Sequence, residues 1–280
     1  MASLLYLLYY FLLPSTWSHS SLRPLPLIQR TVSRLLTAVN FKSYLCRMLA
    51  TLAGRKPEEK DYGLNSGERQ TATRLEGVRV DHRARYQFVI DYLQMTSSRC
   101  RIGLDCFSGT GYGSEMLSAA LDTLMISIDG SEDGIRLAEE NFSSYKTFHV
   151  LKQFPFRLPS QSFDFAVSLE SIEHVERDVE FLQTLANTVV DGGCLFVSAP
   201  NEEVNPFDSK AYKFHCRHYT KDDLAALSQE CGLQIEAIYS QDGYRWVQGE
   251  KEYYTELDDV RPQQGTHGQW LIAVLRKSLQ

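Results

Sequence analysis

The sequence predicts an α/β protein in which helices cover both faces of a doubly wound, largely parallel sheet. From about residue 62, apolar runs of strand length alternate five times with segments of helical periodicity, and two strand-like runs close the chain. The first run leads into a turn with glycines at alternate positions, which is where open α/β sheets bind ligands. At 280 residues the chain can bury a full core, so one domain with appendages is expected.

The first half of this domain is expected to supply three helices and three strands. Helices are expected over 83–95, over 114–121, and from an N-cap at Ser131 to about residue 142. The strands are expected at 102–106, 124–129 and, more weakly, 148–151. The first helix is inferred from apolar residues that recur on one face: Tyr86, Val89, Ile90 and Leu93.

The second half repeats the alternation and then closes the sheet. Strands are expected at 163–169, 194–199, 233–239 and 270–275. A helix over 175–190 ends at the turn formed by Asp191, Gly192 and Gly193, and Thr220 caps another helix that runs to about Cys231. The non-periodic stretches 200–219 and 240–268 follow strand ends and are candidate substrate loops.

The glycine-rich turn predicts a nucleoside site. Gly109, Gly111 and Gly113 follow Asp105, and such glycines allow unusual φ values and a close approach of a ligand to the backbone. Asp129 ends the second strand, where a carboxylate can accept both ribose hydroxyls. A dinucleotide fingerprint places its third glycine at position 114, which is serine here, so a nicotinamide dehydrogenase is disfavoured.

The acidic residue followed by Gly-x-Gly-x-Gly resembles motif I of the class I S-adenosylmethionine-dependent methyltransferases. The segment 156–175, with Glu170, Glu173 and His174, resembles the later motifs of the type 11 group, and the resemblance covers about 65–276. That group includes enzymes that methylate small molecules, quinone precursors and bacterial surface sugars. The resemblance implies a Rossmann-like seven-stranded sheet in the order 3-2-1-4-5-7-6, with the last strand antiparallel.

The resemblance also implies a cofactor site for S-adenosylmethionine. Asp105 and the three glycines are expected around the methionine end, Asp129 on the ribose, and Glu170 facing the reacting methyl group. Arg85 is expected to hold the methionine carboxylate. Where the family commonly places an Asp beside adenine, this chain has Lys152 and Gln153, and only Gln153 can accept the adenine amino group.

The expected reaction is in-line methyl transfer, in which proximity and orientation do most of the work. An oxygen acceptor of high pKa also needs a base, for which His174 is the first candidate and His215 and His218 are the next. A phenolic or carboxylate acceptor needs none. Residues 215–218 offer three potential metal ligands with no fourth at a familiar spacing, so no metal is expected.

Charge and composition separate the first 57 residues from the rest. Residues 1–57 hold seven Lys or Arg and no Asp or Glu, whereas 58–280 hold 22 basic and 35 acidic side chains, a net charge of −13. An acidic domain disfavours a nucleic-acid substrate. The leader is expected to act in targeting or at a membrane surface, or to be dispensable, with Met48 as an alternative start. Six cysteines without a CxxC pair fit a reducing compartment, so a cytoplasmic, optionally membrane-associated protein is expected, with organelle targeting as the alternative.

The sequence therefore predicts a methyltransferase domain over 58–280, acting on a small molecule, lipid-linked precursor or glycan, with O-methylation favoured. The alternative is a non-catalytic module of the same fold that binds a nucleoside or a protein, which the presence of Lys152 motivates. No motif names the acceptor or the oligomeric state.

Overall fold

The computed structural model describes residues 70–278. The leader 1–57 and the expected domain boundary at residue 58 lie outside the described residues and stay predictions. Within the part of the chain that the structure describes, no helix combines the length and hydropathy that crossing a bilayer requires.

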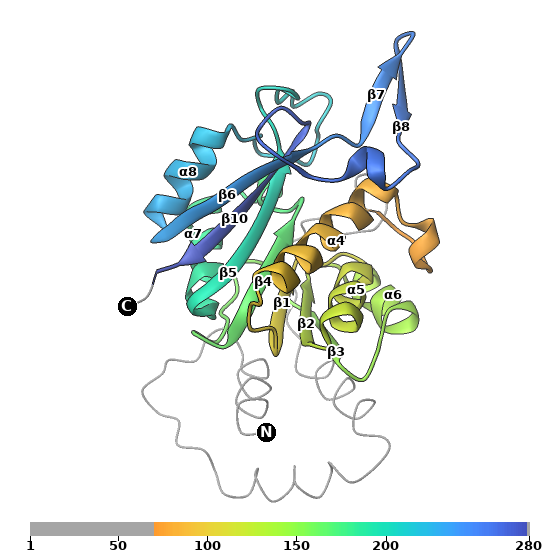
Figure 1. Ribbon diagram of the computed structural model, residues 1–280. Coiled ribbons are helices and arrows are strands. Elements are labelled where there is room, and N and C mark those ends of the chain that lie inside the picture. Colours follow the sequence, from red (N-terminus) through yellow and green to blue (C-terminus); the bar gives the residue numbers. More distant parts are fainter. Residues whose placement is uncertain (1–69, 279–280) are drawn as a thin grey trace, which may run out of the picture. The chain divides into compact units, whose positions relative to one another are not determined.

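One mixed sheet forms the centre of the described domain (Figure 1). In spatial order its strands are β3 (Thr147–Leu151), β2 (Leu124–Asp129), β1 (Ile102–Cys106), β4 (Phe163–Leu169), β5 (Val189–Pro200), β10 (Trp270–Lys277), β6 (Leu233–Gln241) and β9 (Gln263–Gln264). The first five run parallel, and β10 pairs antiparallel with both β5 and β6. The predicted order is confirmed, with β10 as the seventh strand and β9 as a short addition at the edge.

Helices cover both faces of the sheet, as predicted. The helices are α4 (Val80–Met95), α5 (Tyr112–Leu121), α6 (Glu132–Asn141), α7 (Asp178–Thr188) and α8 (Lys221–Glu230), with 3-10 turns η3 (Leu75–Gly77), η4 (Ile172–His174) and η5 (Asp258–Val260). Figure 1 shows α4, α5 and α6 on one side of the sheet and α7 and α8 on the other. Ser131 caps α6 and Thr220 caps α8 through their side-chain oxygens, so both predicted N-caps are confirmed.

The core lies between α4, α5 and the centre of the sheet. Every residue of β4 is buried, which is typical of a central parallel strand with both faces covered. Phe165 and Phe196 on neighbouring strands pack in the same cluster as Tyr92 of α4, and the Tyr92 and Phe196 rings meet edge to face at 5.5 Å. This packing fixes α4 against the centre of the sheet.

Two predicted segments differ in the structure. The turn expected at 191–193 is instead an irregularity within β5. Gly192 has φ +74°, and the pairing register between β5 and β4 shifts at this point. A Cβ on Gly193 would lie 2.7 Å from the Asp164 carbonyl oxygen, so the irregularity needs glycine. The stretch 240–268 is not wholly irregular either, because it contains the hairpin of β7 (Tyr244–Val247) and β8 (Glu250–Tyr253).

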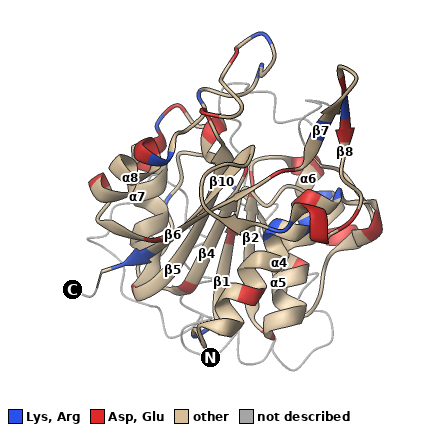
Figure 2. Ribbon diagram, turned by 45° about the horizontal axis from the view of Figure 1, so that its top comes forward, with Lys and Arg blue, Asp and Glu red and all other residues tan. Residues whose placement is uncertain are grey.

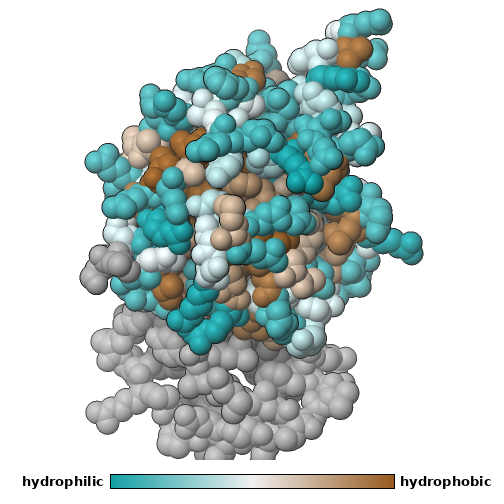
Figure 3. All heavy atoms as spheres, in the orientation of Figure 1, coloured by the Kyte–Doolittle hydropathy of each residue, from teal (hydrophilic) through white to brown (hydrophobic). Residues whose placement is uncertain are grey.

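The hairpin turns at Gln248 and Gly249, which both have positive φ, as a two-residue hairpin turn requires. Its strands have four residues each and are paired mainly with one another, so the sequence carried little periodic signal for them. Figure 3 shows the hairpin as a projection with a mostly hydrophilic surface.

Candidate active site

The three glycines of the first turn are required for three different reasons. Gly109 has φ +59°, and no heavy atom of the described residues lies within 4 Å of a Cβ built on it, so open space adjoins this backbone. Gly111 has φ +82°, and a Cβ there would lie 2.6 Å from that of Ala138. A Cβ on Gly113 would lie 1.9 Å from the Tyr86 ring, so this position is glycine because α4 packs against α5.

Asp129 organises the glycine-rich turn from the end of β2. Its Oδ2 accepts a hydrogen bond from the Gly109 amide at 2.8 Å, and its Oδ1 accepts one from the Ser131 amide at 2.8 Å. A carboxylate has about four acceptor positions, which is more than these two bonds use. The predicted ribose contact is therefore compatible with this geometry and stays a prediction.

Asp105 is enclosed by other side chains of the protein. Its side chain is fully buried and accepts hydrogen bonds from Ser114 Oγ at 2.7 Å and from the Tyr86 hydroxyl at 3.2 Å. Burial raises the pKa of Asp105 to about 7, although both hydrogen bonds oppose the shift. In this conformation the carboxyl group ties α4 and α5 to β1, and its predicted cofactor contact stays a prediction.

Gln153 lies beside the same turn. Its side-chain amide nitrogen donates to the Gly130 carbonyl at 3.1 Å, which leaves the amide oxygen directed elsewhere as an acceptor. The Lys152 amide donates to the Asp129 carbonyl at 2.9 Å, and burial lowers the pKa of its ammonium group. The arrangement is compatible with the predicted adenine contact through Gln153.

Arg85 and Glu170 belong to a buried polar network that the sequence did not reveal in full. Arg85 is 1% exposed; its Nη2 donates to Asp81 Oδ2 at 2.8 Å and its Nε to Gln241 Oε1 at 2.9 Å. Its Nη1 lies 3.6 Å from Glu170 Oε1 and, within the described residues, has no hydrogen-bond partner. The network therefore retains one buried donor for an anion such as the methionine carboxylate.

Glu170 stands at the end of β4 in a left-handed conformation, with φ +53°. Its Oε1 accepts from Ser198 Oγ at 2.8 Å, and burial raises the pKa of the carboxyl group while Arg85 opposes the shift. A non-glycine residue at positive φ is strained and is often found at functional sites. The position agrees with the predicted location beside the reacting methyl group, a role that stays a prediction.

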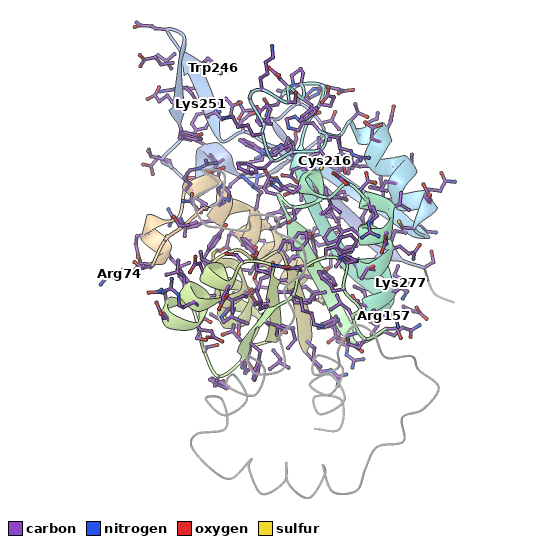
Figure 4. All side chains as sticks on the ribbon, turned by 180° about the vertical axis from the view of Figure 1, so that it is seen from behind. Arg74, Arg157, Cys216, Trp246, Lys251 and Lys277 are labelled. Atoms are coloured by element: carbon purple, nitrogen blue, oxygen red, sulfur yellow. The ribbon has the colours of Figure 1, made fainter. Side chains whose placement is uncertain are left out.

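The structure brings the three predicted catalytic histidines together. The rings of His174 and His215 meet edge to face at 4.7 Å, and His215 Nδ1 lies 2.8 Å from His218 Nε2. His218 Nδ1 lies 2.5 Å from the Asn205 carbonyl oxygen. Figure 4 labels Cys216, the neighbour of His215, in the loop at the end of the sheet where β5 leads into 201–219.

These contacts fix the ring tautomers. The Asn205 carbonyl only accepts, so His218 Nδ1 carries a hydrogen and its Nε2 carries the lone pair of the neutral ring. His215 Nδ1 must then donate to that lone pair, which leaves the His215 lone pair on Nε2. Both nitrogens of His218 are engaged, so His218 positions His215 rather than accepting a proton from a substrate.

The electrostatics keep this pair neutral. Burial lowers the pKa of His215 to about 3, with His174 and His218 adding to the shift, and burial also lowers the pKa of His218. A base with so low a pKa is weak near pH 7. Of the three candidates, His174 is the one that this argument does not weaken, and its role as general base stays a prediction.

Sequence reasoning missed the polar residues that hold the loops in place. Asn201 is fully buried and donates through Nδ2 to the carbonyls of Thr266 and Gly268, which joins the two predicted substrate loops. Gln241 donates to the carbonyls of Asp81 and Val260. The only signal was a polar residue at the end of each strand, which does not name partners 19 to 160 residues away.

Charges of both signs surround this edge of the sheet. Figure 2 turns the edge toward the reader and shows positions of Lys or Arg interspersed with Asp or Glu. Ion pairs such as Arg245–Glu252 on the hairpin, at 3.1 Å, account for part of the pattern. Among the described residues, basic and acidic side chains are therefore mixed at this edge, and the expectation about nucleic acid stays a prediction.

Several curated proteins are similar to part of this chain. Two probable S-adenosylmethionine-dependent methyltransferases of Mycobacterium tuberculosis, from strains CDC 1551 and H37Rv, are each 28% identical over 145 residues, covering 50% of this chain and 52% of the relative. A similar protein of Mycolicibacterium smegmatis is 27% identical over 148 residues, covering 51% and 56%. The chain thus spans about half the length of the curated relatives it matches.

Solved structures show the same fold. An S-adenosylmethionine-dependent methyltransferase of Mesorhizobium loti aligns with a TM-score of 0.53 at 16% identity, covering 71% of this chain and all of that one. One from Clostridium acetobutylicum aligns with a TM-score of 0.53 at 12% identity, covering 70% and 92%. Residues 43–238 match the family model of a methyltransferase domain. Together with the glycine-rich turn at the end of β1 and the sheet order, this match shows that the chain belongs to the class I S-adenosylmethionine-dependent methyltransferases.

Proposed function

We propose that this protein transfers a methyl group from S-adenosylmethionine to an oxygen atom of a small-molecule, glycan or lipid-linked acceptor. One observation carries the proposal: two features lie at the same edge of the sheet. The first is the glycine-rich turn, which is bonded to Asp129, and the second is the cluster of histidines from η4 and from the loop after β5. The first feature suits a nucleoside cofactor, and the second suits a group that loses a proton.

The cofactor supplies the activated methyl group on its sulfonium centre. The residues of this chain bind and orient it: Asp129 on the ribose, Gln153 at adenine, Arg85 at the methionine carboxylate, and Glu170 beside the methyl group. Alignment of an acceptor with the methyl–sulfur bond accounts for on the order of 7–11 kcal/mol of the barrier. His174 is the proposed acceptor of the hydroxyl proton.

Aromatic side chains support an acceptor with a flat or sugar-like face. Tyr212 stacks on His215 with ring centroids 5.0 Å apart, and Trp246 on the hairpin is 66% exposed. Such rings contribute contact area at low entropic cost and bind planar or sugar faces well. A non-catalytic nucleoside-binding role is the second candidate, and Lys152 beside Gln153 is the observation that favours it.

We further propose a cytoplasmic location, with membrane-surface association through the basic segment 1–57. That segment lies outside the described residues. Comparison of the full chain with a variant lacking 1–57 in vesicle sedimentation tests the association, and equal recovery of both on anionic vesicles would remove it.

Calorimetric titration of the full chain with S-adenosylmethionine and S-adenosylhomocysteine tests the cofactor assignment. We expect micromolar binding that Asp129→Ala abolishes, because the ribose loses its acceptor. Asp129→Asn retains one acceptor for the Gly109 or Ser131 amide and separates loss of binding from loosening of the turn. Asp133→Ala, an exposed acid in α6, is the matched control.

Transfer of a labelled methyl group to a panel of hydroxyl, amine and carboxyl acceptors then tests the chemistry. Unchanged affinity in both Asp129 variants contradicts the ribose assignment. Cofactor binding without transfer to any acceptor class, together with recovery of transfer in Lys152→Asp, supports the non-catalytic candidate.

A further inference from the structure

A fourth polar side chain lies against the histidine cluster. It belongs to Glu173, a residue of η4, the turn that comes after β4 in the chain. Glu173 is 1% exposed, and its Oε1 lies 3.9 Å from His174 Nε2. One ligand atom each from Glu173, His174 and His215 lies within 4.8 Å of the other two. Two imidazoles and a carboxylate thus meet from segments about forty residues apart in the sequence.

Each imidazole is oriented through its other nitrogen. His174 Nδ1 lies 3.1 Å from the Phe214 carbonyl oxygen and therefore donates to it, which places the lone pair of the neutral ring on Nε2. His215 Nδ1 donates to His218, which places its lone pair on Nε2 as well. This is the arrangement found around metal-binding histidines, where the second ring nitrogen donates to a carbonyl or another acceptor.

The two segments are also fastened together by the backbone. The Cys216 amide donates to the Glu173 carbonyl at 2.6 Å, so the residue after His215 is held against the residue before His174. Farther along the loop, Arg217 Nη1 and the Tyr219 hydroxyl both donate to Asp178 Oδ2, at 2.8 and 3.0 Å. The cluster is therefore held in place before any ligand binds.

We propose that Glu173, His174 and His215 bind a divalent transition-metal cation such as Zn²⁺. Two imidazoles with one carboxylate suit zinc, cobalt, manganese or ferrous iron, whereas Mg²⁺ and Ca²⁺ prefer oxygen ligands. Bonds of about 2.1 Å place tetrahedral ligands roughly 3.4 Å apart, so the ligand atoms must approach by about 1 Å. The sequence of residues 215–218 showed no further metal ligand at a familiar spacing. In the folded chain, Glu173 and His174 of η4 lie close enough to His215 to be those ligands.

Three protein ligands leave a coordination position open, which is the pattern of a catalytic rather than a structural site. The use of that position rests on the proposed methyl transfer, with His174 then acting as a ligand of the cation in place of accepting the hydroxyl proton. A hydroxyl bound to the cation loses its proton to solvent more easily, because a metal lowers the pKa of a bound oxygen. The resulting oxygen attacks the methyl carbon, the carbon–sulfur bond breaks, and the sulfonium becomes a neutral thioether.

The test is a titration of the chelator-treated full chain with Zn²⁺ by calorimetry and with Co²⁺ by visible absorption. We expect one cation per chain, with Co²⁺ bands typical of low coordination number. Glu173→Gln and His215→Gln are expected to lower the affinity by at least 100-fold. His218→Gln removes only the partner that orients His215, and is expected to lower it about 10- to 100-fold.

His267→Gln is the matched control, because His267 is exposed and lies outside the cluster. Unchanged Zn²⁺ affinity in Glu173→Gln and His215→Gln, or no Co²⁺ bands in the folded protein, would overturn the proposal. Calorimetry with S-adenosylhomocysteine, which the ligand variants are expected to bind normally, reports on the proposed function separately. If chelator removes the cation and methyl transfer continues unchanged, the cation has no part in the reaction. His174 then remains the proposed acceptor of the hydroxyl proton.

Discussion

At the scale of single residues, similar side chains in this site have different tasks. Within residues 70–278 a Cβ on Gly109 would meet no side chain, whereas Gly113 makes room for Tyr86. Asp129 accepts from two backbone amides, whereas Asp105 is enclosed by Tyr86 and Ser114. The residue type gives the chemistry, and the neighbours decide whether it faces a ligand or the protein.

Gly113→Ala is expected to lower stability, because the new Cβ meets the Tyr86 ring and α4 must shift. Overpacking of this kind costs roughly 1–3 kcal/mol in the free energy of unfolding. Gly109→Ala has room for its Cβ and carries only backbone strain of about 1–2 kcal/mol, but it places a methyl group where the cofactor is expected. Urea unfolding and cofactor calorimetry check both variants; equal loss of cofactor affinity in the two would contradict the distinction.

Asp105→Asn is expected to change how stability depends on pH. The folded pKa is about 7 and the ordinary value 3.8, so between these values the folded protein binds more protons than the unfolded one. The contribution of Asp105 is therefore full below about pH 4 and is lost as the pH rises to about 7. Urea unfolding from pH 5 to 8 should show a shallower decline in Asp105→Asn than in the wild type, and parallel curves would count against the assignment.

At the scale of elements, local sequence signals define where α6 and α8 begin. Thr220 and Asp223 form a reciprocal capping box at the start of α8, in which each side chain accepts from the backbone amide of the other residue. The β7–β8 hairpin lacks such signals, and its Trp246 and Tyr253 stay largely exposed. Elements with strong caps were therefore found from sequence, and the hairpin was not.

Thr220→Ala is expected to lower the free energy of unfolding by about 1 kcal/mol, because the Asp223 amide loses its acceptor. Thr184→Ala in the middle of α7 serves as the control, since its hydroxyl only bonds back to the Glu180 carbonyl. Chemical denaturation of both variants measures the difference. A loss in Thr184→Ala as large as that in Thr220→Ala would show that the cap has no special role.

At the scale of the whole domain, the sheet order brings the site together. The carboxyl ends of β1, β2, β4 and β5 lie at one edge, so the glycine-rich turn, Asp129, Glu170 and Ser198 meet there (Figure 1). Just after β5, Asn201 donates to the Thr266 carbonyl, and at the end of β6, Gln241 donates to the Asp81 carbonyl of α4. Side chains at the strand ends thus tie the loops and α4 to the sheet.

S-adenosylhomocysteine is expected to raise the melting temperature of the full chain. At a hundred times its Kd a ligand adds about 2.7 kcal/mol to stability, which corresponds to roughly 5–10 °C for a domain of this size. NADH at the same concentration should produce no shift, because position 114 lacks the third glycine of a dinucleotide site. A larger shift with NADH than with S-adenosylhomocysteine would contradict the cofactor assignment.

The parts of the fold that the amino-acid sequence predicts are those that local interactions control. The strands at 102–106, 124–129 and 163–169 have the predicted bounds, because buried parallel strands are rich in apolar residues. The caps at Ser131 and Thr220 follow from short-range hydrogen bonds. The sheet order came from resemblance to a family, since periodicity gives strands but not their neighbours.

Only the tertiary structure decided which polar groups meet. The bulge at Gly192, the hairpin and the pairing of β9 depend on partners far along the chain. The same holds for the site: Glu173 and His174 meet His215 only because the loop after β5 folds back over the end of β4. Closing a loop of that length is a property of the whole fold, and no local pattern in the sequence encodes it.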